Sequence, residues 1–347
     1  MQILQIIKII NNYKIMKQKI LLCVVVAINS IVFAGQLPAQ ESSTGVKGKS
    51  SFIQLTLVPP LSTNGFRSYR YSNHISINLL AGLSQNEYGF ALGGLANLVR
   101  GQSNGFMLAG LVNHVRNGGR GTMLSGGMNM AYRLYSGWLF AGLANVAQDV
   151  DGFQFAGLLN KAKDVNGVQL AGLINVAENS DCPIGLINII KNGEMGVAIT
   201  YDEMGSALLS FRSGGKYTYG IVGMGYNHKT HGRSYAAQVG YGVHIPCTSW
   251  LRVNNELKVS CFGYSNDPLI IHDDHLKNTV IHVGYSLLPA FRLHSRVELF
   301  GGPSINYVDA GWKNKETLPS HSLWESSGSG RFRQIHLGFQ AGVQYAF

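Results

Sequence analysis

A tandem repeat of 15 or 16 residues runs through the first half of the chain and limits its fold more than any other feature. Each copy has about eleven residues of strand character around a central glycine, followed by four or five polar or glycine residues. A glycine at every centre disfavours helix by roughly 1 kcal/mol per copy relative to alanine. The full copies begin at Gly89, Gly105, Gly121, Gly137, Gly152 and Gly167. A partial copy begins at His74 and a degenerate one at Ile184.

Alternation within each copy indicates β-structure. In the copy at Gly167, Val168 and Leu170 fall on an apolar face, whereas Gln169 and Asn175 fall on a mixed, amide-bearing face. A run of about eleven residues matches the roughly 9–11 residues of a membrane-spanning strand. We therefore expect each copy to be one antiparallel strand of a barrel.

A parallel β-solenoid is the alternative for these repeats. It requires a sharp turn inside each eleven-residue run, and only the central glycine offers one. The repeat asparagines would then stack into one ladder, whereas in a meander they would alternate between the two rims. In either fold we expect their amides to satisfy hydrogen bonds rather than to bind a ligand. They are Asn97, Asn113, Asn129, Asn145, Asn160 and Asn175.

The second half alternates more sharply. From Ile335 to Phe347 one face is apolar and ends in aromatics, and the other is polar or glycine. Lipid-facing barrel strands have this pattern, with charged side chains turned away from lipid. The residues expected to face the lumen are Gln169, Asn175, Gln238, His244, Arg252, Glu256, Lys258, His282, Arg296, Glu298, His336 and Gln340.

Connection lengths provide an independent check on the barrel. Counting back from the carboxyl terminus, the long connections are 309–332, 264–278 and 227–234, and the short ones between them are 288–293, 246–249 and 212–215. Every long connection falls at one end of the barrel and every short one at the other. Outer-membrane barrels have this asymmetry, with the longer loops extracellular.

Composition and charge exclude several classes of protein. Hydrophobic residues make up 46% of the chain and charged residues only 13%, against roughly 25% in soluble domains. These values exclude global disorder and disfavour an ordinary soluble enzyme. The net charge of +10 is inflated by four lysines among residues 1–34; the rest carries 24 basic and 18 acidic residues, without a basic run. We predict no nucleic-acid partner.

The amino-terminal segment predicts export. Lys17 and Lys19 precede a mostly apolar run from Ile20 to Phe33, with small residues at Ala34 and Gly35. This run is shorter than a membrane span and has the order of a secretory signal peptide. We expect residues 1–34 to be the signal peptide, with 1–15 upstream of the true start, and 35–73 to be a lead-in segment.

The tandem copies of the form G-Φ-Q-L-A-G-L-x-N, with Φ apolar, resemble the bacterial surface-repeat proteins of spirochaetes and Bacteroidetes-type bacteria. The lead-in Pro59–Gly65 and the segment Asn73–Gly82 are similar to the region that precedes such repeats. The final strand ending in Phe347 resembles the carboxyl-terminal signal of outer-membrane proteins. The resemblance implies placement at the outer membrane, and it implies no reaction.

Chemistry-bearing clusters are few. His272, Asp273, Asp274 and His275 offer metal-type ligands, but we interpret them as a solvated loop tip. Inward histidines near carboxylates raise the possibility of a barrel hydrolase, although no Ser-His-acid spacing and no G-x-S-x-G motif accompany them. The three cysteines that remain after export lack disulfide or zinc spacing. We therefore predict no catalytic residue, no metal and no cofactor.

These observations lead to one predicted architecture and two functions. We expect an all-β, up-and-down transmembrane barrel of about 16 strands over residues 74–347, with the repeats at 89–190; the alternative is a β-solenoid followed by a smaller barrel. We predict an outer-membrane protein at the cell surface that passes small solutes. The alternative is a non-conducting interaction protein that binds an extracellular ligand through loops 264–278 and 309–332. Expected partners are outer-membrane lipid and the barrel-assembly machinery.

Overall fold

The computed structural model describes residues 48–229, 234–264, 280–311, 318–328 and 330–347. The predicted signal peptide, the first third of the lead-in (residues 35–47) and the segment His272–His275 lie outside these residues. The chain divides into two compact units, one ending at Ala156 and the other beginning at Gly157. No helix among the described residues combines the length and apolar character needed to cross a membrane.

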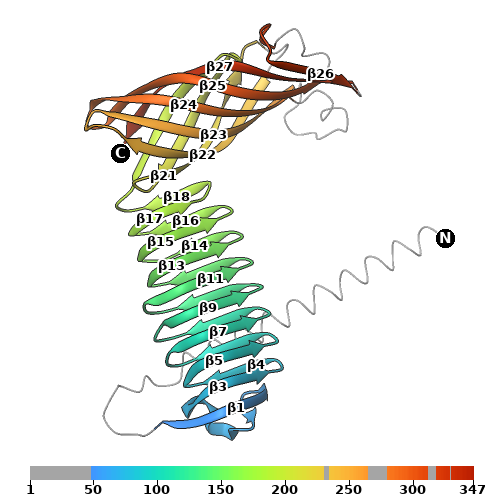
Figure 1. Cartoon of the computed structure of the whole chain (residues 1–347), viewed down its shortest axis with the longest axis vertical. Helices are drawn as coiled ribbons and strands as arrows, with labels where there is room; N and C mark the ends of the chain where they lie inside the picture. The colour runs from blue at the N-terminus through green and yellow to red at the C-terminus, as the bar shows by residue number, and fades with distance from the viewer. Residues whose placement is uncertain (1–47, 230–233, 265–279, 312–317, 329) are drawn as a thin grey trace, which may run out of the picture. The chain divides into compact units, whose positions relative to one another are not determined.

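The first unit is a stack of parallel β-rungs (Figure 1). Each rung contributes one strand to each of two sheets. In the first sheet the strand order is β13-β11-β9-β7-β5-β3-β1-β2 and in the second it is β12-β10-β8-β6-β4. The first sheet comprises β1 (Lys49–Val58), β2 (Leu61–Ser62), β3 (Tyr71–Asn78), β5 (Asn86–Gly93), β7 (Ser103–Ala109), β9 (Gly119–Ser125), β11 (Tyr135–Ala141) and β13 (Asp149–Ala156). The second comprises β4 (Ala81–Ser84), β6 (Ala96–Val99), β8 (Val112–Val115), β10 (Met128–Ala131) and β12 (Ala144–Ala147).

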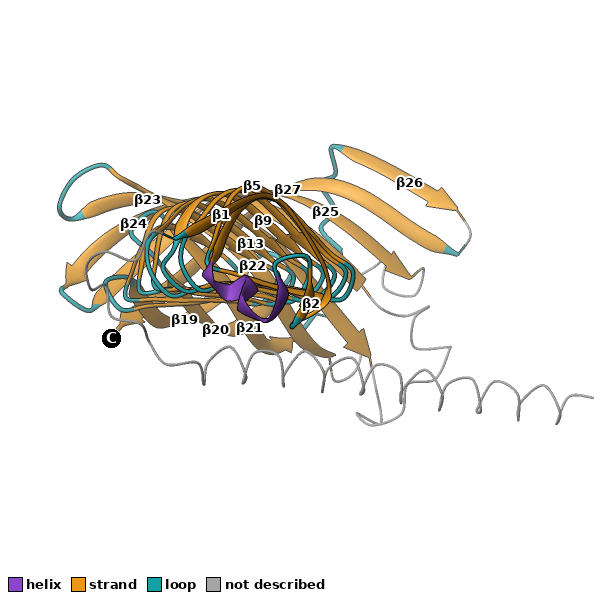
Figure 2. Ribbon diagram, turned by 90° about the horizontal axis from the view of Figure 1, so that it is seen from below, coloured by secondary structure: helices purple, strands orange, loops and turns teal. Residues whose placement is uncertain are grey.

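The central glycine of each repeat makes the corner that the solenoid requires. At Gly126 a Cβ would lie 2.4 Å from the carbonyl oxygen of Gly110, and at Gly142 it would lie 2.2 Å from that of Gly126. Each eleven-residue run therefore bends at its centre into two short strands instead of continuing as one. The 3-10 helix η1 (Gly65–Arg70) lies near β1 at the amino-terminal end of this stack (Figure 2).

The second unit begins with one single rung strand and two full rungs and continues into an antiparallel barrel. The rung strands are β14 (Leu159–Lys161), β15 (Asp164–Ala171), β16 (Ile174–Ala177), β17 (Asn179–Ile184) and β18 (Ile187–Ile190). The barrel strands are β19 (Glu194–Asp202), β20 (Ser206–Gly214), β21 (Thr218–Asn227), β22 (Ser234–Pro246), β23 (Leu251–Tyr264), β24 (Val280–His294), β25 (Val297–Gly311) and β27 (Arg331–Ala346). A short strand, β26 (Trp324–Gly328), forms a hairpin with the start of β27.

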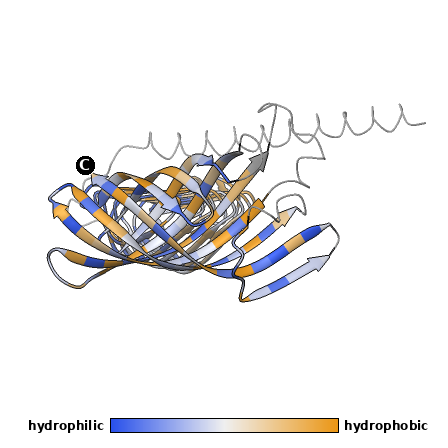
Figure 3. Ribbon diagram, turned by 90° about the horizontal axis from the view of Figure 1, so that it is seen from above, coloured by the Kyte–Doolittle hydropathy of each residue, from blue (hydrophilic) through white to orange (hydrophobic). Residues whose placement is uncertain are grey.

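Pairing of β19 with β27 closes the barrel at eight strands. Gly196 pairs with Ala346 and Asp202 pairs with Gln340, so no edge is left open along this seam. Hydropathy alternates along the barrel strands (Figure 3). Leu337 and Phe339 are more than half exposed on the outside, whereas His336 and Gln340 are buried inside.

This architecture corrects the expectation of one 16-stranded barrel. The repeats run parallel: Asn113 lies opposite Asn129, and Gly121 opposite Gly137. An up-and-down barrel needs antiparallel neighbours, so the repeats supply no barrel strands. The alternative, a solenoid followed by a smaller barrel, describes the chain correctly.

The predicted strand alternation of the second half is confirmed, with two shifts in the turns. Residues 288–293 continue β24 rather than forming a turn, and the chain turns at 294–297. Likewise Arg212 lies within β20, and the turn follows Gly214. The strand ends that flank the long connections all lie at the opposite end from these short turns, as expected.

The last rung packs against the short-turn end of the barrel. The backbone N–H of Asn188 donates to Ser213 Oγ at 2.9 Å, and its side-chain amide donates to the Ser213 carbonyl at 3.1 Å. Thr218 Oγ1 donates to the carbonyl of Pro183 at 2.7 Å. These bonds tie β17 and β18 to the β20–β21 hairpin.

Candidate functional site in the barrel interior

The polar face of the barrel strands encloses a buried ionic network. Glu256 on β23 is fully buried, and its carboxylate meets Arg212 Nη1 at 2.9 Å and Lys258 Nζ at 2.8 Å. The Tyr219 hydroxyl donates to the same carboxylate at 2.8 Å. Because a buried charge is tolerated only when it is paired, these groups depend on one another.

A second ionic group lies nearer the short-turn end. The Arg252 guanidinium donates to both oxygens of Glu194, each at 2.8 Å, and lies 2.9 Å from Glu298 Oε2. His244 Nδ1 lies 2.8 Å from the side-chain oxygen of Asn254. Three cations and three carboxylates therefore balance across the two groups.

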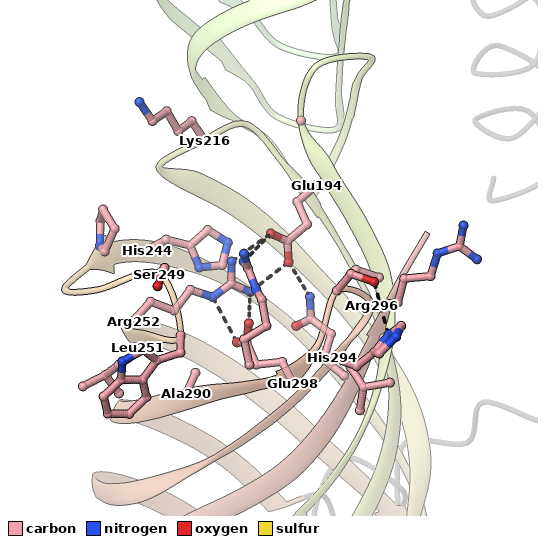
Figure 4. Close-up of a pocket in the computed structure, with 18 of the residues that line it drawn as sticks. Glu194, Lys216, His244, Ser249, Leu251, Arg252, Ala290, His294, Arg296 and Glu298 are labelled. Atoms are coloured by element: carbon pink, nitrogen blue, oxygen red, sulfur yellow. Dashed lines mark hydrogen bonds and ion pairs between the residues drawn. The ribbon is translucent and has the colours of Figure 1, made fainter.

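The barrel mouth at this end is hollow. A cavity of about 560 Å³ reaches the Arg252 group, and Lys216, Arg292 and Arg296 are among its lining residues (Figure 4). Basic side chains are part of its lining, and Arg212 lies elsewhere in the barrel, 4.3 Å from the centre of the Phe300 ring. This arrangement can hold water or a small anion.

Buried apolar side chains cluster toward the opposite end of the interior. The set, termed here the apolar plug, consists of buried residues on the inward face, with Leu318 packed against them. Its members are Met204, Leu208, Ala236, Phe262, Val280, Val308 and Ala310.

Between the ionic network and the apolar plug lies a cluster of Glu203, His282 and His336. Glu203 lies in the β19–β20 turn, and the two histidines lie on β24 and β27. His336 Nε2 is 3.1 Å from Glu203 Oε1, and one ligand-type atom from each of the three residues lies within 4.8 Å of the others. Among the described residues this is the group that could hold a metal ion.

The structure brings together most of the residues predicted to face the lumen. Gln238, which donates to Ser260 Oγ at 3.0 Å, and the other interior residues of strands β22–β27 are buried within the barrel. Those others are His244, Arg252, Glu256, Lys258, His282, Glu298, His336 and Gln340.

Three of the predicted residues lie elsewhere. Gln169 and Asn175 are fully buried in the rungs of the solenoid, because the repeats form no barrel strands. Arg296 is exposed in the short β24–β25 turn, where it donates to the Tyr345 hydroxyl at 3.4 Å. Arg296 therefore lies at the rim of the cavity rather than on a barrel strand, because the turn lies later in the chain than expected.

Sequence reasoning missed Glu194, Glu203 and Arg212. A signal was present for two of them. Residues 194–202 alternate Glu, Gly, Ala, Thr and Asp with apolar side chains, and Arg212 continues the small, polar face of residues 206–210. Glu203 has no such signal, since it lies in a turn and reaches the histidines only through the closed fold.

Comparison with known proteins does not assign the chain to a family. No model of a known protein family matches the chain, and no curated protein matches it.

Proposed function

We propose that this chain is an outer-membrane protein whose eight-stranded barrel is a non-conducting anchor for a β-solenoid interaction domain. The observation that carries the proposal is a closed barrel with an apolar exterior and an ionic interior. A lipid environment accommodates exposed side chains such as Ile199, Leu257 and Val343, which water does not favour. Closure also leaves no open strand edge around the barrel, as lipid requires.

The filled interior favours an anchor over a passive pore. Eight strands enclose a space just wide enough for side chains, whereas porins with open channels have 16–18 strands. Here the ionic network and the apolar plug occupy that space. We therefore favour a non-conducting barrel over a pore, with the solenoid rather than the extracellular loops as the interaction domain, and we propose no enzymatic reaction for the barrel.

Connection lengths orient the barrel in the membrane. We place the short turns and the carboxyl terminus on the periplasmic side and the long connections outside, as in other outer-membrane barrels. The rungs of residues 159–190 contact the short-turn end, so they are periplasmic in this orientation. We expect the assembly machinery to recognise β27 with its terminal Phe347.

The solenoid surface supports an interaction function. In the first unit, exposed apolar side chains form columns, because equivalent residues of successive rungs lie opposite one another. Exposed patches of this kind mark interaction sites. A shallow groove of about 780 Å³ lies beside one column, with Arg120, Trp138 and Asp151 along its sides and glycines along its floor. The exposed apolar residues are Ile77, Phe90, Leu108, Trp138, Leu143 and Phe155.

Heat-modifiability and bilayer recording test the proposal together. The protein from an outer-membrane fraction should migrate faster on an SDS gel before boiling than after, because the closed barrel resists SDS. The same sample in a planar bilayer should show no conductance steps above a protein-free control. Recovery in a soluble fraction without a mobility shift would refute the anchor, and stable single-channel steps would refute the closed interior.

A further inference from the structure

The cluster of Glu203, His282 and His336 has the composition of a transition-metal site. It offers two imidazole nitrogens and one carboxylate, a donor set that suits zinc and other borderline ions better than calcium or magnesium. The three residues come from three separate elements, and the barrel fold brings them together. We propose that these residues bind one divalent ion of the zinc class.

An unpartnered nitrogen provides independent support. His282 is 7% exposed, and its Nε2 has no hydrogen-bond partner among the described residues. An unsatisfied buried polar atom is costly, and a bound ion or water is one way to satisfy it. The ring of His282 lies 6.4 Å from that of His336 and nearly parallel to it, with an interplanar angle of 9°. An ion held between Nε2 and the Glu203 carboxylate would satisfy that atom.

A small polar cavity adjoins the cluster and can supply a further ligand. It has a volume of about 10 Å³, close to the minimum for one water molecule. Its lining includes Asp202, Glu203, His282, Asn306 and Gln340. Three protein ligands with one water complete the four-coordinate arrangement that zinc prefers.

Outer hydrogen bonds hold the ligands in place. Glu203 Oε2 accepts the backbone N–H of Phe339 at 3.0 Å, and Oε1 accepts the Asn306 amide at 2.5 Å. The Gln334 carboxamide lies 3.2 Å from His336 Nδ1. The contacting atom is the Gln334 side-chain nitrogen, so Nδ1 accepts its hydrogen and Nε2 carries the proton that a bound ion would replace.

The proposed ion would cross-link three elements of the barrel next to the apolar plug. It would link the β19–β20 turn to β24 and β27, on either side of β25 in the closed sheet. Binding of the ion is independent of whether the solenoid binds a partner.

The test uses the full-length, tag-free protein, folded in detergent after treatment with a chelator and then given Zn²⁺ or Co²⁺. After desalting, the wild type should retain about one Zn²⁺ per chain by elemental analysis. The Co²⁺ form should show visible d–d absorption, and the gel-shift temperature should rise on metal addition. These wild-type measurements do not depend on any variant folding.

Three variants locate the site. Glu203→Gln and His282→Asn should lose the retained ion and the Co²⁺ absorption, while the control His244→Asn, a buried interior histidine outside the cluster, should keep both. A mobility shift on SDS gels verifies that each variant is folded. A folded wild type that retains no ion, or a folded His282→Asn protein that retains it fully, would overturn the proposal and leave a hydrogen-bonded cluster without metal.

Discussion

Each of the two units contains a buried carboxylate that contributes to its stability. Each carboxylate accepts hydrogen bonds or ion pairs from several donors. In the barrel, Glu256 serves two cations and one hydroxyl at once. In the solenoid, Glu87 is 3% exposed and accepts hydrogen bonds from Asn73 and from Ser76, the latter at 2.8 Å. The two carboxylates differ in that Glu256 is neutralised by cations and Glu87 has only neutral donors. Their replacement should therefore have different consequences.

Replacement of Glu256 by alanine should strongly destabilise the barrel. It would leave Arg212 and Lys258 buried without their shared counter-charge, which costs about 3–5 kcal/mol in comparable buried pairs. Urea unfolding in detergent should show this as a lower midpoint, and the gel-shift temperature should fall. The control Glu325→Ala removes an exposed carboxylate and should change stability by less than about 0.5 kcal/mol. Equal midpoints for the two variants would contradict the network.

Glu87 should make the first unit more stable in mild acid than at neutral pH. Burial raises the pKa of Glu87 to about 7 from its usual value near 4.5. Between these values the folded unit holds more protons than the unfolded chain, so the free energy of unfolding falls as pH rises. The loss is about 3 kcal/mol across that window and ends above pH 7.

This pH dependence can be followed by Trp138 fluorescence in urea, with Trp250, Trp312 and Trp324 replaced by phenylalanine. Glu87→Gln imitates the protonated acid, so its unfolding curve should not move between pH 4.5 and 7. If the free energy of unfolding of this variant changes with pH as much as that of the wild type, another group causes the pH dependence.

At the scale of elements, the asparagine ladder is the main hydrogen-bonding device of the rungs. In the first unit the amide of each ladder residue donates to the side-chain oxygen of the next, from Asn97 to Asn113 at 2.9 Å and from Asn113 to Asn129 at 3.0 Å. The second unit continues the same pattern from Asn160 to Asn175 at 3.0 Å. Each amide also binds backbone carbonyls near the corner, so it fixes the turn as well as the stack.

Replacement of Asn129 by alanine should remove hydrogen bonds within the solenoid and destabilise the rung locally. Its amide donates to the carbonyl of Phe140 at 2.7 Å and to Asn145 Oδ1 at 3.0 Å, and both acceptors would lose a donor inside the solenoid. Each unsatisfied buried group costs about 1–3 kcal/mol. Hydrogen exchange should accelerate in β10 and β12 of the variant. The exposed Asn117→Ala is the matched control, and equal exchange in the two variants would refute the ladder's role.

At the scale of the whole molecule, the proposed orientation places the two ends of the barrel in different compartments. Cys247 is exposed in the short connection between β22 and β23, and Ser327 is exposed on β26 at the opposite end. A reagent that cannot cross the outer membrane should therefore distinguish them.

Labelling of intact cells with a membrane-impermeant maleimide tests this orientation. With Cys182 and Cys261 replaced by serine, Cys247 should react only after the outer membrane is permeabilised. A Ser327→Cys variant that also has Cys247→Ser should react in intact cells. The reverse pattern would mean that the barrel has the opposite orientation. Labelling of both cysteines in intact cells would contradict their separation by the outer membrane.

The sequence by itself determined that the chain is all-β, and it determined which face of each barrel strand is buried. Alternation is a local property with a period of two, so Gln238, Lys258 and His336 could be assigned to the interior from their neighbours alone. It also contained the repeat and the ordering of long and short connections.

Only the tertiary structure decided how the repeats pair and how many strands close the barrel. A straight eleven-residue strand and a run bent at Gly126 have the same alternation, and the choice depends on the carbonyl of the preceding rung. The His–Glu cluster was likewise beyond sequence reasoning, because Glu203 and His336 are 133 positions apart and meet only when β19 pairs with β27. Local patterns fix which way a side chain points; closure of the sheet fixes which side chains it meets.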